Sequence, residues 1–119
     1  MTSPLVSKIS GLCLIFGTAL IAEPAKAEHS GSDMLRIYGS ANAQEKQTIE
    51  GLVRATENGM SWFSAAAKVK LYCPPEKLAL TGGQIIDILR REVGEAPSIG
   101  GSPYGLAILL ALKRTFPCP

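Results

Sequence analysis

Hydrophobic residues are unevenly distributed along the chain, and the first apolar block differs from those that follow. A mainly apolar run covers residues 9–21, after a short polar start that ends at Lys8. The run is shorter than the roughly 20 residues that a membrane-spanning helix needs. Ala25-Lys26-Ala27 follows it with the small-x-small pattern of a cleavage site. The pattern predicts a cleaved secretory signal peptide over residues 1–27, and residues 28–119 as a single exported domain.

Two alternatives to this interpretation are cleavage after Ala22 and retention of the segment as an N-terminal anchor. Cys13 could suggest a lipid attachment site. We do not expect lipidation, because Leu12 stands where a small residue is needed and the apolar run continues past Cys13. Residues 28–40 are mostly polar and rich in Gly and Ser, with a small apolar cluster at Leu35, Ile37 and Tyr38. We expect them to form a frayed arm that docks through these three side chains.

Helical spacing of apolar residues is clearest over residues 43–68. Glu50 and Arg54 lie mostly on the opposite face, at the i, i+4 spacing of a helical ion pair. The turn dipeptide Asn58-Gly59 interrupts the segment. We expect one long helix, with two helices as the alternative. The apolar positions, expected to face the core, recur about three, four and seven residues apart: Ile49, Leu52, Val53, Met60, Phe63 and Ala67.

A second helix is predicted after the proline-rich corner at residues 71–75, where consecutive prolines exclude helix. Thr81 and Gln84 have the spacing of a capping box, and Leu80 can pack against Ile85 as a hydrophobic staple. The helix is expected to run to about Val93. Gly94 then stands where a C-terminal glycine cap belongs. The paired glycines at residues 82–83 lack any phosphate-loop motif, so a plain helix cap is the simpler interpretation.

A third helix is predicted after a loop at residues 95–101, with Ser102 as its cap and Pro103 in its first turn. This helix is apolar nearly all round, which is typical of a central core helix or of one that faces a partner. Residues 106–112 are therefore a candidate homodimer face. The apolar residues are Leu106, Ile108, Leu109, Leu110 and Leu112.

These elements predict an all-α fold, a small compact helical bundle of three to five helices with one disulfide. Cys73 and Cys118 are the two cysteines outside the predicted signal peptide. An even pair in a small exported domain indicates a structural disulfide. A redox-active pair is the alternative, but catalytic dithiols usually lie close together as Cys-x-x-Cys.

Composition and charge narrow the function further. The 119 residues carry 12 Lys and Arg against 10 Asp and Glu, a net charge of +2 that does not suggest nucleic-acid binding. The single histidine, His29, leaves little for acid–base catalysis or a metal site, so we expect no enzyme activity, metal or cofactor. Asp87, Glu92 and Glu95 are interpreted as solvated charges on a helix face.

Three short motifs occur in order across the second half of the chain. They are Tyr72-Cys73-x-Pro75, Leu80-Thr81-x-x-Gln84, and an apolar helix that ends Ala111-Leu112-x-x-x-Phe116-Pro117-Cys118. With the proline-bearing loop between the last two, this order resembles the Tai-type family of small exported helical proteins, the immunity proteins to type VI secretion amidase effectors. The resemblance covers about residues 49–118.

The resemblance implies a periplasmic α bundle whose partner is a secreted peptidoglycan amidase, which it binds and inhibits. We expect no nucleic-acid partner and, after signal cleavage, no contact with a membrane. A rigid loop between two helices can plug a concave active-site groove with little ordering cost. In this chain the candidate is the loop after the second helix, with Ile99 expected to be an exposed apolar anchor. The candidate partner-binding residues are Glu95, Pro97, Ser98, Ile99, Gly100 and Tyr104.

Two other functions fit the same sequence. One is a periplasmic acid-stress chaperone of the HdeA kind, also small, helical and held by a single disulfide. The other is an adaptor of the cell envelope whose partner is unknown. A chaperone should open reversibly at low pH, whereas an adjacent amidase gene would favour immunity.

Overall fold

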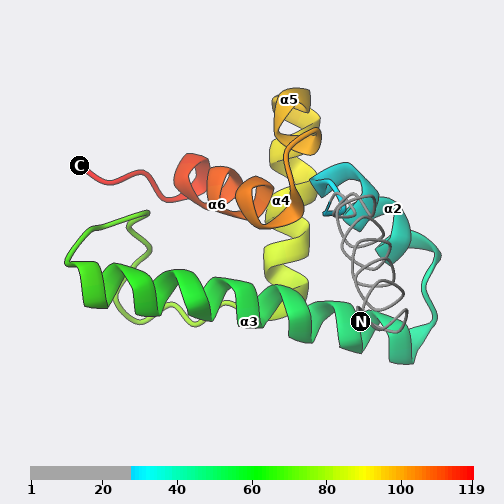
Figure 1. The fold of residues 1–119 in the computed structure, drawn as a ribbon, viewed down its shortest axis with the longest axis horizontal. Coiled ribbons are helices and arrows are strands. Elements are labelled where there is room, and N and C mark those ends of the chain that lie inside the picture. Colours follow the sequence, from blue (N-terminus) through cyan, green and yellow to red (C-terminus); the bar gives the residue numbers. More distant parts are fainter. Residues whose placement is uncertain (1–27) are drawn as a thin grey trace, which may run out of the picture.

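The computed structural model describes residues 28–119, and these residues form helices with no strand among them (Figure 1). The predicted signal peptide over residues 1–27, with both candidate cleavage sites, lies outside the described residues. The described part confirms the predicted all-α bundle with one disulfide. The helices are α2 (Gly31–Ser40), α3 (Ala43–Ala67), α4 (Gly82–Glu95), α5 (Pro97–Gly100) and α6 (Tyr104–Thr115).

The segment expected to be a frayed arm is instead the regular helix α2. The Ser30 hydroxyl accepts a hydrogen bond from the Asp33 amide, and the Asp33 carboxylate accepts one from the Ser30 amide. Together they form a capping box. Met34 is buried in the core, and Leu35 and Tyr38 pack against it as expected. The helix start is tied to α6, because Ser30 forms an isolated antiparallel bridge with Pro103. The arm prediction was wrong because Ser30 and Asp33 form a capping box, which stabilises the start of a helix in this segment.

The long helix α3 confirms the prediction of one continuous helix through Gly59. It begins with a capping box between Asn42 and Glu45 and ends at Ala67, where Lys68 follows as the C-cap with a left-handed φ of 55°. The expected pairing of Glu50 with Arg54 is not among the ion pairs of the described residues. Glu50 instead accepts a hydrogen bond of 2.6 Å from the Tyr38 hydroxyl, which links α2 to α3.

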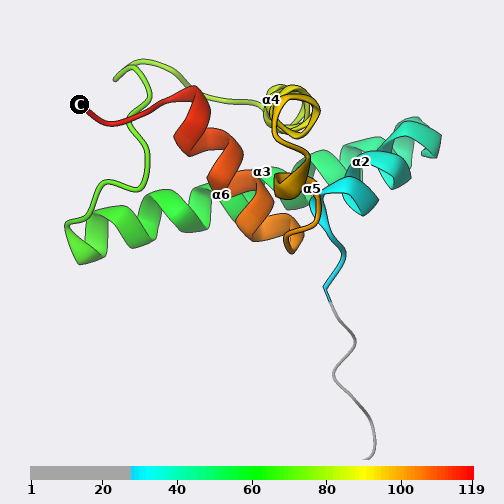
Figure 2. The ribbon, with the colours of Figure 1, turned by 90° about the horizontal axis from the view of Figure 1, so that it is seen from above.

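Helix α4 lies at the centre of the bundle and packs against every other helix described. Its predicted capping box between Thr81 and Gln84 is confirmed. The helix crosses α3 steeply and is seen nearly end-on in Figure 2. At the crossing the backbones approach closely, since a Cβ atom added to Gly82 would collide with the backbone of Glu50. The fully buried side chains of α4 are Ile85, Ile86 and Leu89.

Two predicted helix ends differ from the structure. Helix α4 passes through Gly94 and ends at Glu95, because Pro97 sets the break instead. Helix α6 begins after Pro103, and no side chain caps it. Ser102 does not act as the predicted cap. Its carbonyl oxygen accepts the Gly31 amide at 2.9 Å, in the contact that joins the starts of α2 and α6.

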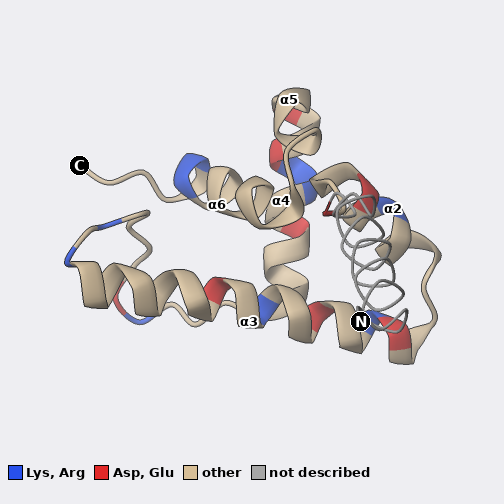
Figure 3. Cartoon of the chain, viewed as in Figure 1, with Lys and Arg blue, Asp and Glu red and all other residues tan. Residues whose placement is uncertain are grey.

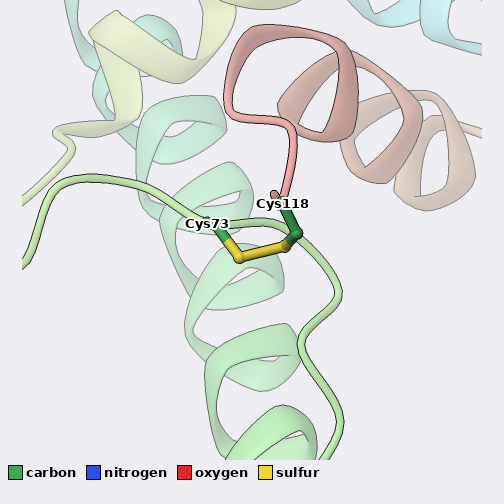
Figure 4. The surroundings of a disulfide bond; sticks show 2 residues. All are labelled: Cys73 and Cys118. Atoms are coloured by element: carbon green, nitrogen blue, oxygen red, sulfur yellow. A yellow bond between two sulfur atoms is a disulfide. The ribbon is translucent and has the colours of Figure 1, made fainter.

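The disulfide between Cys73 and Cys118 is formed, as the sequence predicts (Figure 4). It joins the loop after α3 to the tail after α6. A backbone hydrogen bond of 2.8 Å from the Cys73 amide to the Phe116 carbonyl runs beside it. The long irregular segment at residues 68–81 is therefore attached to the bundle near its middle.

Candidate interaction surfaces

The corner between α4 and α6 brings together the candidate partner-binding residues. Glu95 ends α4, Pro97 and Ser98 form the first turn of α5, and Tyr104 begins α6. Glu95, Pro97 and Ser98 are exposed, whereas Tyr104 is half-buried and packs against the core. The segment predicted as a loop is thus a short helix at one tip of the molecule (Figure 1).

Ile99 and Gly100 do not face outward, which corrects the expectation of an exposed apolar anchor. The Ile99 side chain is 5% exposed and belongs to the core. Gly100 is buried too, and a Cβ atom there would collide with the Ser32 side chain and lie 3.0 Å from Val93. A single isoleucine in a short polar connection attaches that connection to the core. The linear sequence does not show this, because the residues that cover Ile99 come from elsewhere in the chain.

Glu92 is the most buried charged group described, with a side chain only 6% exposed. Arg114 on α6 donates to it at 2.7 Å, and Arg91 and Thr115 donate at 3.3 Å. The Arg114 hydrogen bond, opposed by burial and aided by Arg91, holds the pKa of the Glu92 carboxyl below its ordinary value. The same pair raises the pKa of Arg114.

The prediction that Glu92 is a solvated charge was therefore wrong. The position of Glu92 in the sequence indicates its burial, because it falls seven residues after Ile85 and three after Leu89. These spacings place it on the buried face of α4. Both Glu92 oxygens accept hydrogen bonds within the fold, so this carboxylate joins α4 to α6. In the part of the chain described, no group of three or more His, Cys, Asp or Glu side chains could hold a metal ion.

A second exposed surface lies at the C-terminal end of α3. Phe63 was expected in the core but is 57% exposed, and its neighbour Trp62 is 77% exposed. Leu52, expected in the core as well, is 46% exposed. The prediction failed for Phe63 because α3 extends past α4 and α6 (Figure 1). It failed for Leu52 because the adjacent Val53 is the residue that faces the core at this level of the helix. The core contacts of α3 come from Val53, Ile49 and Met60.

The candidate homodimer face at residues 106–112 turns out to be largely the interior of the bundle. Ala107, Ile108, Ala111 and Leu112 are buried, and only Leu106 is strongly exposed, at 47%. The apolar character of α6 is explained by its contacts with all the other described helices.

Comparisons with protein-family models, with curated proteins and with solved structures find no match. The resemblance to the Tai-type immunity family thus stays a prediction from the three motifs. Among the described residues, no helix combines the length and apolar character needed to cross a membrane.

Proposed function

We propose that this protein is an exported, non-catalytic immunity-type protein of the periplasm that binds and inhibits a secreted peptidoglycan amidase. The observation that carries the proposal is the corner at α5. There Pro97 and Ser98 are exposed on a turn whose next two residues, Ile99 and Gly100, are anchored in the fold.

The rigidity of this turn supports its role as an inhibitory plug. The Ile99 amide donates to the Ala96 carbonyl at 3.0 Å, and the Ser102 amide donates to the Ile99 carbonyl at 3.1 Å. The backbone of the turn is thus held from within, and the Ile99 side chain fixes it to the core. A turn that is already ordered loses little conformational entropy on binding.

The groups that this corner offers to a partner are polar. The Ser98 hydroxyl and the Glu95 carboxylate, whose side chain is 61% exposed, can reach hydrogen-bonding groups in an amidase groove. Glu95 also lies 3.6 Å from Arg114, which restricts its direction. Tyr104 is half-buried and packs against the core, so it offers less of its surface to a partner.

The test is capture of an amidase by the oxidised protein from secreted proteins of its own and neighbouring strains, followed by a peptidoglycan-hydrolysis assay. Ser98→Arg should weaken inhibition at least about a hundredfold, because a long charged side chain would occupy the tip. Gln47→Arg, an exposed change far along α3, is the matched control and should inhibit like the unchanged protein. If no amidase is captured, or if Ser98→Arg inhibits normally, the proposal fails.

Ile99 serves a different purpose in this test. Because its side chain is buried, Ile99→Asp should unfold the protein rather than remove a surface contact. It is therefore unsuitable as a binding variant. A protein with Ile99→Asp that melts like the unchanged chain would contradict the anchored turn.

A second candidate function, acid-stress chaperone activity, is favoured by the buried Glu92. Protonation of this carboxylate at low pH would remove the ionic link between α4 and α6. Circular dichroism and dye binding between pH 2 and 7 separate the candidates. A chaperone opens reversibly by about pH 3 and retains denatured client proteins there, whereas an inhibitor need not open.

A further inference from the structure

We propose that the end of the molecule formed by the C-terminal part of α3 and the following loop docks onto an anionic lipid bilayer surface. This inference does not rest on amidase inhibition, and it departs from the sequence-based expectation that the mature domain contacts no membrane. We call this end the lysine–aromatic end. Its exposed members are Trp62, Phe63, Lys68, Val69, Lys70, Lys77 and Leu78.

Four of the six strongly exposed large apolar side chains of the described residues belong to this end. Trp62 is 77% exposed, Phe63 57%, Val69 48% and Leu78 41%. Only Leu52 and Leu106 are comparably exposed among the large apolar side chains described. Clustered exposure of large apolar groups marks an interaction surface, whereas single exposed residues do not. The clustering therefore calls for a partner at this end.

The charged residues in the sequence around these side chains are mostly lysines. Between Glu57 and Glu76 the only charged residues are Lys68 and Lys70, and Lys77 follows directly. None of these lysines takes part in the ion pairs found among residues 28–119. Figure 3 shows basic residues at this end, with most acidic residues farther along α3, α4 and α2. Glu76 is the one acidic residue within the loop. The charge pattern therefore fits an anionic partner.

The combination of exposed aromatic side chains and lysines favours a lipid surface over a protein as the partner. Lysine is depleted from protein interfaces, where aromatic residues pair with other apolar groups. Trp and Phe beside lysines are instead typical of segments that lie in the membrane interface, where lysine binds anionic headgroups and the rings enter the acyl boundary. A second copy meeting this end symmetrically would oppose lysines to lysines. An anionic bilayer satisfies both the rings and the charges.

The fold presents this end as a fixed unit. The Cys73–Cys118 disulfide attaches the loop to the tail of α6, and the Tyr72 hydroxyl donates to Glu57 of α3 at 2.8 Å. The corner at α5 lies well away from the end of α3 in both views (Figures 1 and 2). Docking on a bilayer would therefore leave that corner free.

The experiment uses Trp62 as its own probe, because it is the only tryptophan of the chain. The oxidised protein, with its N-terminus defined by mass spectrometry, is titrated with vesicles of phosphatidylcholine and phosphatidylglycerol (7:3) and with pure phosphatidylcholine vesicles. We expect a blue shift of the emission and co-sedimentation with the anionic vesicles. Binding to neutral vesicles, or in 0.5 M salt, should be at least tenfold weaker.

Two pairs of variants assign the binding to this end. Lys68→Gln with Lys70→Gln should weaken binding at least tenfold. Arg54→Gln with Arg90→Gln removes the same charge elsewhere and should change it less than threefold.

The second pair tests the apolar contact. Phe63→Ser should weaken binding at least fivefold, whereas Leu106→Ser, which changes a similarly exposed residue outside this end, should leave it nearly unchanged. All these positions are exposed, and thermal melting checks that each variant folds.

Three results would overturn the proposal. The first is an unchanged Trp62 emission with anionic vesicles. The second is an equal loss of binding in the matched variants, which would place the contact elsewhere. The third is a blue shift that depends on protein concentration without vesicles, which would assign this surface to protein contact. None of these results tests the inhibition attributed to Ser98, so the amidase proposal is tested independently of this one.

Discussion

Single atoms decide how closely α3 and α4 approach. Gly82 lies in the first turn of α4 against the backbone of Glu50, where there is no space for a Cβ atom. The next residue, Gly83, has ordinary room, since a Cβ atom there would lie 3.5 Å from the Glu50 carboxylate. Two adjacent glycines, alike in the sequence, thus have different structural roles.

We expect Gly82→Ala to lower the free energy of unfolding by about 1–3 kcal/mol, the usual cost of overpacking. Gly83→Ala is the matched control and should be neutral or slightly stabilising, because alanine is the better helix former. Urea denaturation of both variants measures the difference. Equal stabilities would mean that the helices can separate at the crossing without cost.

At the scale of elements, α3 remains one helix although Asn58-Gly59 lies inside it. A Cβ atom added to Gly59 would meet no neighbouring atom within 4 Å, so neither packing nor a turn requires glycine there. The helix passes through because its caps lie far from this position, at Asn42 and Lys68. Gly59 therefore lowers the stability of α3 without a packing contact that requires it.

Gly59→Ala should therefore stabilise the protein by about 0.5–1 kcal/mol, since alanine loses less backbone entropy in a helix. Thermal melting followed by circular dichroism measures this change. A lower melting temperature for Gly59→Ala would show that the helix bends or opens at this position in solution.

The link between α4 and α6 depends on the ionised Glu92. Its pKa in the folded protein lies below the ordinary value of 4.5, mainly because of the Arg114 hydrogen bond. A folded pKa below the unfolded one adds stability that is fully present above the unfolded pKa. This contribution is lost as the pH falls through the folded pKa.

We expect the free energy of unfolding to fall below about pH 4.5, and Glu92→Gln to remove part of that dependence. At pH 7 the same variant should be less stable by about 1.5–3 kcal/mol, the range for hydrogen bonds to charged groups. Denaturation at pH 7 and pH 3 measures both effects, with the exposed Glu76→Gln as control. An unchanged pH profile for Glu92→Gln would assign the acid sensitivity to other carboxylates such as Asp33, whose pKa is also lowered by its Arg36 and Ser30 hydrogen bonds.

At the scale of the whole molecule, a small core is supplemented by one covalent link. The disulfide closes a loop with a sequence separation of 45 and joins the segments that follow α3 and α6. The segment between α3 and α4 is irregular and mostly exposed. Its position therefore depends on this link and on the hydrogen bond beside it.

Replacing both Cys73 and Cys118 by serine should lower the free energy of unfolding by up to about 4 kcal/mol, from the entropy of the opened loop. The loss is a large share of the roughly 5–15 kcal/mol typical of a domain. Guanidinium denaturation of the oxidised, reduced and double-serine proteins measures it. Reduced and double-serine proteins should agree, and stability equal to the oxidised form would contradict the role of the link.

The sequence by itself determined the helical class, the long helix α3, the capping box at Thr81 and the pairing of Cys73 with Cys118. The helical features follow from local signals, namely apolar periodicity, caps and prolines. The disulfide follows from the expectation that Cys13 belongs to a cleaved signal peptide, which leaves one pair of cysteines. The capping box at Ser30 and Asp33 is an equally local signal, and it predicts the start of α2 from the sequence. The expected helix end at Gly94 was wrong because Pro97 stops the helix instead. The expected cap at Ser102 was wrong because no side chain caps α6.

Only the tertiary structure decided which apolar and charged residues are buried. Ile99 is covered and Phe63 is not, and Glu92 is buried although Glu95 beside it is exposed. The physical reason is that burial depends on which elements cross at a position and where a helix extends past its neighbours. A local pattern shows the face of a helix that is apolar, but only the packed helices show how far along that face the core reaches.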